Sequence, residues 1–166
     1  MENKKVLLTR ENKITNELQA ITHKKYKDLN LEYIEVFYLD HEVDEDSGLI
    51  NRDKTAKHYT KNQIDRNMKA LKNAYHISKG AASPVEIINF RNKYQISAST
   101  FSIVLGFSKN TISNIENEGI TSLPSGRLIK MCLENKNILY QYIQLCDYID
   151  ERKKEEISKR LMEEFV

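Results

Sequence analysis

Residues 96–117, ISASTFSIVLGFSKNTISNIEN, decide the fold expected for this chain. The pattern predicts a helix, a tight turn at Gly106 and a second helix, because Gly readily takes the positive φ that such a turn favours. Ser97 and Ser108 stand where each helix would begin and can cap it. Ser102 is small at the point where the two helices would cross closely. These features predict a helix-turn-helix, whose second helix enters the major groove of DNA.

The second predicted helix, residues 109–117, has an apolar and a polar side. Ile112 and Ile115 would face the core, which leaves the Asn side chains facing outward. An Asn amide can form two hydrogen bonds with adenine, and Ser or Lys can contact bases or phosphates. Base contacts are therefore expected from Asn110, Ser113, Asn114 and Asn117. Phosphate contacts are expected from Ser97, Ser108, Lys109, Thr111, Arg91 and Lys93. The alternative is a helical hairpin with an ordinary polar surface.

Residues 95–118, QISASTFSIVLGFSKNTISNIENE, resemble the DNA-binding core of Cro/Xre-type repressors. Arg91 also matches the arginine common near the end of their first helix. The wider stretch, residues 59–165, resembles the helix-turn-helix regions of MqsA/YgiT-like antitoxins from toxin–antitoxin loci. The resemblance implies a sequence-specific repressor that binds DNA and regulates its own operon.

The chain departs from the MqsA-like pattern at several positions. Asn114 stands where those proteins offer a base-reading arginine, and Ala98 replaces a glutamine that contacts phosphate. Residues 1–58 contain no Cys, so the N-terminal zinc ribbon of MqsA-like proteins is not expected here. The resemblance therefore implies DNA binding without metal binding and without a particular toxin.

Residues 1–58 predict a small α+β unit of different character. Residues 11–25 could form a helix, and residues 33–39, YIEVFYL, are rich in the β-branched and aromatic side chains of strands. An acidic loop, residues 40–48, follows and Leu49 and Ile50 would begin a return strand. This unit could bind a protein partner by strand addition at residues 33–39. The side chains expected to contact such a partner are Tyr33, Val36, Phe37 and Tyr38.

Residues 59–166 predict a helical domain around the helix-turn-helix. The pairs Thr60/Gln63 and Ser83/Glu86 have the spacing of capping boxes, and helices are expected after each. Further helices are expected from about residue 123, from about residue 137 and over residues 150–165. In the last of these, Ile157, Leu161 and Phe165 form a stripe that either packs on the protein's own core or forms a dimer seam. The expected fold class is mainly α, with a C-terminal Xre-like domain preceded by the small α+β unit.

Composition excludes several functional classes. The chain has 166 residues, of which 40% are hydrophobic and 30% charged, with a net charge of +2. Residues 59–118 hold 8 Lys and Arg against 4 Asp and Glu, so the basic excess lies around the helix-turn-helix. No apolar run approaches the roughly 20 residues of a membrane span. Two Cys and four scattered His form no metal motif, and no nucleophile, base or phosphate-binding loop is recognisable. We therefore expect a cytoplasmic protein that is not an enzyme and has no catalytic residue, metal or cofactor.

These patterns lead to two functional hypotheses. The first is a dimeric repressor, antitoxin-like, that reads double-stranded DNA at an inverted-repeat operator with residues 109–117. The second is a protein of a phage or other mobile genetic element whose N-terminal unit binds and inhibits a protein partner, either a toxin or a host protein. The two are compatible, because one chain can carry both surfaces.

Overall fold

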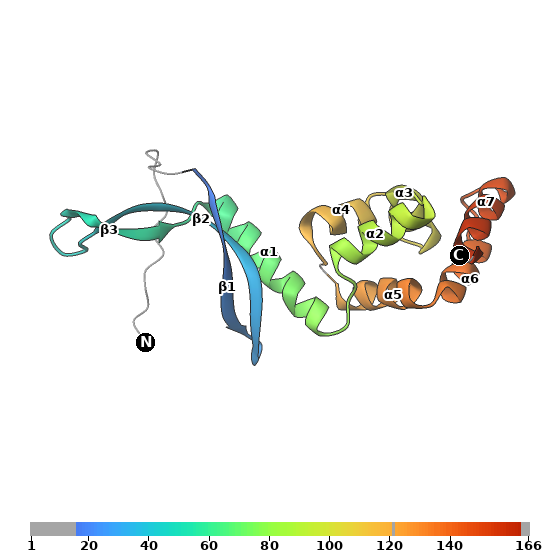
Figure 1. Cartoon of the computed structure of the whole chain (residues 1–166), viewed down its shortest axis with the longest axis horizontal. Coiled ribbons are helices and arrows are strands. Elements are labelled where there is room, and N and C mark those ends of the chain that lie inside the picture. Colours follow the sequence, from blue (N-terminus) through green and yellow to red (C-terminus); the bar gives the residue numbers. More distant parts are fainter. Residues whose placement is uncertain (1–15, 121, 164–166) are drawn as a thin grey trace. The chain divides into compact units, whose positions relative to one another are not determined.

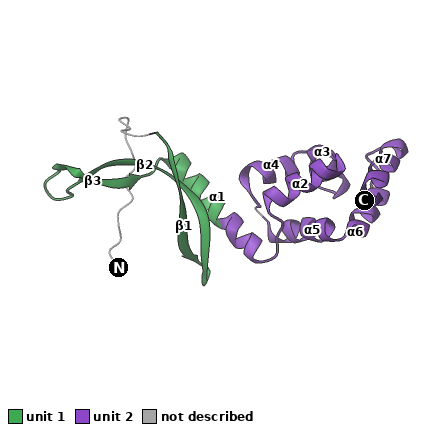
Figure 2. Cartoon of the chain, viewed as in Figure 1, with its two compact units in different colours: residues 1–71 green, residues 72–166 purple. Residues whose placement is uncertain are grey.

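The computed structural model of the chain describes residues 16–120 and 122–163. It divides into two compact units, residues 1–71 and residues 72–166 (Figure 2). The division falls within the long helix α1 (Lys61–Ser78). The sequence predicted a boundary after residue 58. The boundary lies later because the first half of α1 belongs with the strands, to which Asn67 bonds.

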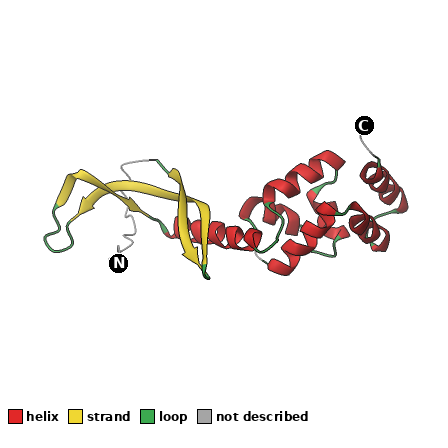
Figure 3. Ribbon diagram, turned by 60° about the horizontal axis from the view of Figure 1, so that its bottom comes forward, coloured by secondary structure: helices red, strands yellow, loops and turns green. Residues whose placement is uncertain are grey.

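The first unit contains an antiparallel sheet of three strands in the order β1-β2-β3 (Figures 1 and 3). The strands are β1 (Leu18–Tyr26), β2 (Leu29–Val43) and β3 (Ile50–His58). β2 is shared: residues 29–37 pair with β1, and residues 38–43 pair with β3. Lys27 and Asp28 join β1 to β2 with φ of 43° and 66°. A two-residue hairpin of the I′ type requires positive φ at both positions.

The predicted fold class, mainly α, is wrong: the fold is mixed α+β, with 9, 15 and 9 residues in the three strands. The helix predicted over residues 11–25 is wrong from Leu18 onward, because those residues form β1. Residues 11–15 lie outside the described residues. The physical reason is that the backbone N–H and carbonyl groups of β2 need hydrogen-bond partners, which residues 18–26 supply as an antiparallel neighbour. The predicted return strand at Ile50 is confirmed as β3.

The first turn of α1 has the predicted capping box. The Thr60 backbone N–H donates to the Gln63 side chain at 2.9 Å, and the Gln63 N–H donates to the Thr60 hydroxyl at 3.2 Å. Further along, the Asn67 amide accepts from the Val36 N–H at 2.8 Å and donates to the Val36 carbonyl at 2.9 Å. The Asn67 side chain therefore makes the same pair of hydrogen bonds to the β2 backbone that a residue of a neighbouring strand would make.

The second unit is helical beyond the end of α1. Its helices are α2 (Pro84–Tyr94), α3 (Ala98–Val104), α4 (Thr111–Glu118), α5 (Leu123–Glu134), α6 (Lys136–Leu145) and α7 (Glu151–Met162). Side chains from all of them meet in one core, including Ile87, Phe101, Ile112, Ile129, Leu139 and Leu161. The predicted capping box at Ser83 and Glu86 is present at the start of α2. The local signals thus place the helices close to their predicted bounds.

The apolar stripe of α7 packs on the protein's own core. Ile157 and Leu161 are 2% and 0% exposed and belong to the same core cluster as α2 and α3. Phe165, the third residue of the stripe, lies outside the described residues. A dimer seam along Ile157 and Leu161 is therefore excluded. Within residues 16–120 and 122–163, no helix combines the length and the apolar character needed to cross a membrane.

Candidate nucleic-acid interface

A buried serine holds α4 against α3. Ser102 is fully buried, and its hydroxyl donates to the Ala98 carbonyl at 2.9 Å. The same hydroxyl accepts a hydrogen bond from the Ile112 N–H at 2.9 Å. The first N–H groups of a helix have no partner within that helix, so this bond satisfies one of them for α4. Ser102 thus fixes where α4 begins, in addition to its predicted role as a small residue at the crossing.

A charged pair joins α2 to α4. The Arg91 guanidinium donates to both carboxylate oxygens of Glu116, at 2.5 and 2.8 Å, and to the Ile96 carbonyl at 3.1 Å. The two charged side chains are only 16% and 10% exposed. The predicted phosphate contact of Arg91 is therefore wrong, because its donors point into the protein. Glu116 lies four residues after the buried Ile112 and therefore on the same, inner side of α4. An acidic residue on an inner side needs a basic partner, and this was the signal in the sequence for the pair with Arg91.

The turn between α3 and α4 has the predicted geometry. Gly106 has φ +80°, a value that costs an L side chain about 1–2 kcal/mol. The next residue, Phe107, turns back and donates its N–H to the Ser102 carbonyl at 2.9 Å. The predicted cap of α3 is also confirmed, since the Ser97 hydroxyl accepts from the Thr100 N–H at 3.1 Å.

The start of α4 differs from the prediction by two residues. The helix was expected over residues 109–117 but begins at Thr111, so that Lys109 and Asn110 belong to the preceding turn. Ser108 does not cap it: Asn110 occupies the capping position without a side-chain bond to the helix, and the Ser108 hydroxyl lies 2.8 Å from that of Thr111. The turn forms because the Thr111 N–H bonds to the Ser108 carbonyl at 3.0 Å.

The predicted base-reading side chains share one exposed surface around the start and outer side of α4. Asn110, Asn114 and Asn117 are exposed, whereas Ile112 and Ile115 are 0% and 6% exposed on the inner side. In the described part of the chain, the amides of these three Asn side chains have no hydrogen-bond partner. The fourth predicted residue, Ser113, is half-buried and donates its hydroxyl to the Asn110 carbonyl at 3.1 Å. Three free amides therefore face away from the core, and Ser113 is committed to the backbone.

The predicted phosphate-binding residues lie at the end of α2 and at the starts of α3 and α4. Lys109 is exposed in the turn before α4. Lys93, also exposed, places its ammonium 5.3 Å from the centre of the Tyr94 ring at the end of α2. Ser97 and Ser108 are exposed, and Thr111 is half-buried, so their hydroxyls lie near the surface at the starts of α3 and α4. Apart from Arg91, the predicted phosphate-binding residues therefore reach the surface of the second unit.

The predicted strand-addition site on β2 is wrong. Val36 and Phe37 are each 6% exposed, and Tyr33 and Tyr38 are half-buried. β2 lies in the middle of the sheet, with β1 on one side and β3 on the other from Tyr38 onward. At Val36 the remaining edge is closed by the Asn67 amide. An incoming strand would find no continuous row of free backbone groups on residues 33–39.

The described residues offer no metal site, and the comparisons with known proteins give no relative. Among the residues that the structure describes, no group of three or more His, Cys, Asp or Glu side chains could hold a metal ion. Comparisons of the chain with protein-family models, with curated proteins and with solved structures found no match.

Proposed function

We propose that this protein is a sequence-specific DNA-binding repressor that regulates its own operon. The turn at Lys109 and Asn110, with the outer side of α4, would enter the major groove. One observation carries this proposal: three exposed Asn amides without partners stand on an element that Ile112 and Ile115 anchor from behind. Base edges in the major groove supply the donors and acceptors that such amides lack.

The surrounding contacts support rigid presentation of this surface. A reading surface needs side chains held in place by elements that do not move. The Ser102 hydroxyl fixes the first turn of α4, and the pair of Arg91 and Glu116 fixes its last turn. Asn is also a poor helix former, so Asn114 and Asn117 reduce the local stability of α4. Folding offers no compensation for that cost, whereas reading of adenine does.

The charge at the surface predicts modest dependence on salt. Lys93 and Lys109 are the lysines expected to contact phosphates in each protomer. A dimer with four such contacts would have a slope of log K against log salt of about −4. Base contacts would therefore supply much of the specific affinity. Because of the three Asn side chains, adenine is the expected base within each half-site.

The wider proposal is a homodimer acting in the cytoplasm on an inverted repeat. Dimeric helix-turn-helix proteins read half-sites separated by about one helical turn or a multiple of it. The resemblance of residues 95–118 to Cro/Xre-type repressors supports this mode. The resemblance to MqsA/YgiT-like antitoxins extends the proposal to an antitoxin-like role in which the protein represses a toxin–antitoxin operon.

The test starts from unbiased DNA, because the operator is not needed in advance. The full chain would select binding sites from random double-stranded DNA, and affinity for the selected site would be measured by fluorescence anisotropy. Asn110→Ala and Asn114→Ala should each cost about 1–3 kcal/mol of binding free energy. Asn137→Ala, an exposed Asn on α6, is the matched control and should leave affinity unchanged.

Two results would contradict the proposal. One is a failure to enrich any DNA sequence at low salt. The other is an enriched site that both variants bind as tightly as the wild-type chain, since the base-reading surface would then lie elsewhere.

A further inference from the structure

One edge of β1 is open. β1 pairs with β2 along residues 18–26, and within the described residues no strand pairs with its other edge. The Val36 N–H and carbonyl turn away from β1 to bond Asn67, so the pair of Val36 and Gln19 is not hydrogen-bonded. Bonded and non-bonded pairs alternate in an antiparallel ladder. The backbone groups of Gln19, Ile21, His23 and Lys25 therefore point to the open edge.

An apolar cavity of about 380 Å³ lies between α1 and the hairpin of β1 and β2, and Thr22, His23 and Lys24 of β1 line it. Ile64, Met68 and Leu71 of α1 form one wall. The β1 wall consists of three consecutive residues, 22–24. Side chains alternate between the two faces of a strand, so three consecutive lining residues mean that backbone atoms of β1 also border the cavity. Ile64 and Met68 are 38% and 41% exposed, although they lie on the same side of α1 as Leu71, which is 2% exposed.

The buried carboxylate in this cavity, Glu35, already has partners within the protein. Glu35 accepts hydrogen bonds from Thr22 at 3.1 Å, from Lys57 at 2.8 Å and from Tyr59 at 2.6 Å. Burial raises the pKa of Glu35, but the bonds from Lys57 and Tyr59 outweigh that effect and hold the pKa below its ordinary value. The carboxylate is therefore charged and fully paired, which leaves it little capacity to bind a cationic ligand.

One exposed lysine lies in the lining of the cavity. Lys24 lines it, is exposed and has no ion-pair partner within residues 16–120 and 122–163. The other basic lining residue, His23, has its Nε2 3.0 Å from a carboxylate oxygen of Glu32. An occupant that combines an apolar group with a nearby negative charge would complement this site.

We propose that the open edge of β1 and this cavity form a docking site for an extended, acidic peptide segment of a partner protein. The segment adds to the sheet as a fourth strand and places one large apolar side chain against Ile64 and Met68. A carboxylate two residues along the segment lies on the same face and reaches Lys24. Strand addition of this kind takes affinity from main-chain bonds and specificity from pockets for alternate side chains.

A second copy of the chain is a poorer occupant. Its own β1 edge would bring Lys24 and Lys25 toward a strand that carries the same charges. The proposal is also independent of DNA binding, because the edge and the cavity lie in the first unit and α4 lies in the second. Loss of one activity in a variant would leave the other measurable.

The experiment uses a phage-displayed library of random dodecapeptides against the full chain. The proposal expects enriched peptides with a large apolar residue and an Asp or Glu two positions away. A synthetic consensus peptide would then be measured by fluorescence anisotropy. Methylation of alternate backbone nitrogens in that peptide should reduce affinity about tenfold or more, because it removes main-chain donors without changing the protein.

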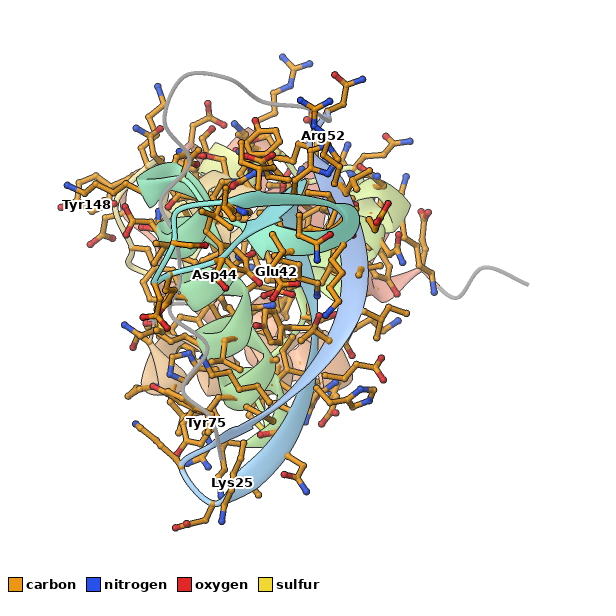
Figure 4. All side chains as sticks on the ribbon, turned by 90° about the vertical axis from the view of Figure 1, so that its left-hand side faces the viewer. Lys25, Glu42, Asp44, Arg52, Tyr75 and Tyr148 are labelled. Atoms are coloured by element: carbon orange, nitrogen blue, oxygen red, sulfur yellow. The ribbon has the colours of Figure 1, made fainter. Side chains whose placement is uncertain are left out.

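Two substitutions on neighbouring residues test the face of the strand. Lys24→Glu should weaken the consensus peptide about tenfold. Lys25→Glu is the matched control: Lys25 is exposed on the opposite face of β1, near the turn end of the hairpin (Figure 4), and should change affinity less than twofold. Met68→Ala should weaken the peptide about tenfold by removing part of the apolar wall.

Several results would overturn the proposal. Failure to enrich any peptide would do so, as would a consensus with helical spacing or with basic residues. Equal effects of Lys24→Glu and Lys25→Glu would place the contact on another surface. If the protein dimerises at high concentration, and if Lys24→Glu strengthens that dimer, the occupant of the site would be a second copy of the chain.

Discussion

Arg91 and Glu116 join the end of α2 to the last turn of α4 through two charge-assisted hydrogen bonds. Both side chains are largely shielded from water, so removal of one leaves the charge of the other with little hydration to replace the lost pair. The pair therefore holds the proposed reading helix on the rest of the domain.

Truncation of the arginine tests this role. Arg91→Ala should lower the free energy of unfolding by about 3–5 kcal/mol, because it leaves the Glu116 carboxylate buried and unpaired. Urea denaturation followed by circular dichroism measures the change. Lys93→Ala, two residues away and exposed, should alter stability by less than about 0.5 kcal/mol while it weakens DNA binding. Equal urea midpoints for Arg91→Ala and the wild-type chain would show that the pair contributes nothing.

Removal of the Ser102 hydroxyl tests the other end of α4. Ser102→Ala should destabilise the protein by about 1–3 kcal/mol, since the buried Ile112 N–H loses its partner. The comparison is Ser113→Ala in α4, where the lost bond to the Asn110 carbonyl is exposed to water. Thermal unfolding of both variants distinguishes them. A Ser113→Ala variant as unstable as Ser102→Ala would argue against a special role for the buried hydroxyl.

Gly126 in α5 should not tolerate a side chain. Replacing Gly by Ala inside a helix ordinarily gains about 0.5–1 kcal/mol. Here a Cβ atom would lie 2.5 Å from the Cβ of Ala81 and 2.9 Å from Cγ2 of Ile120. Gly126→Ala should therefore cost about 1–3 kcal/mol through overpacking. Ser125→Ala in the same turn provides the control, and chemical denaturation reports both. A stabilised Gly126→Ala variant would contradict the close packing of α5 on Ala81.

The buried Glu35 should make the first unit sensitive to acid. Its pKa in the folded protein lies below the ordinary value of 4.5, so folding is favoured while the carboxylate is charged. The stabilisation is fully present above pH 4.5 and is lost as the pH falls through the lower folded-state pKa. Urea midpoints measured between about pH 6 and pH 3 should fall more steeply for the wild-type chain than for Glu35→Gln. Parallel curves for the two proteins would exclude this linkage.

Local signals in the sequence predicted much of the second unit. Ser97 caps α3, Gly106 makes the turn, and Ser83 with Glu86 starts α2, because each of these interactions lies within a few residues. The start of α4 was misplaced because Lys109 and Asn110 can continue a helix by pattern alone. Only the bond between Ser102 and Ile112 shows where the helix begins.

The first unit was harder to predict because its interactions depend on distant partners. Lys27 and Asp28 are not the Asn-Gly pair that usually marks a two-residue hairpin, so β1 resembled a helix. That Asn67 meets Val36, 31 residues away in the chain, cannot be read from either position. The interpretation of residues 33–39 as a strand was correct, but its position in the middle of the sheet depended on finding β1.

The order β1-β2-β3 has a kinetic consequence. Each ladder joins strands that follow one another in the chain, and the first hairpin closes across only Lys27 and Asp28. Short loop closures carry a small entropic barrier, and topologies rich in such contacts fold quickly. Stopped-flow refolding of this sheet should therefore lack the slow phases typical of β proteins whose strands cross over from far along the chain.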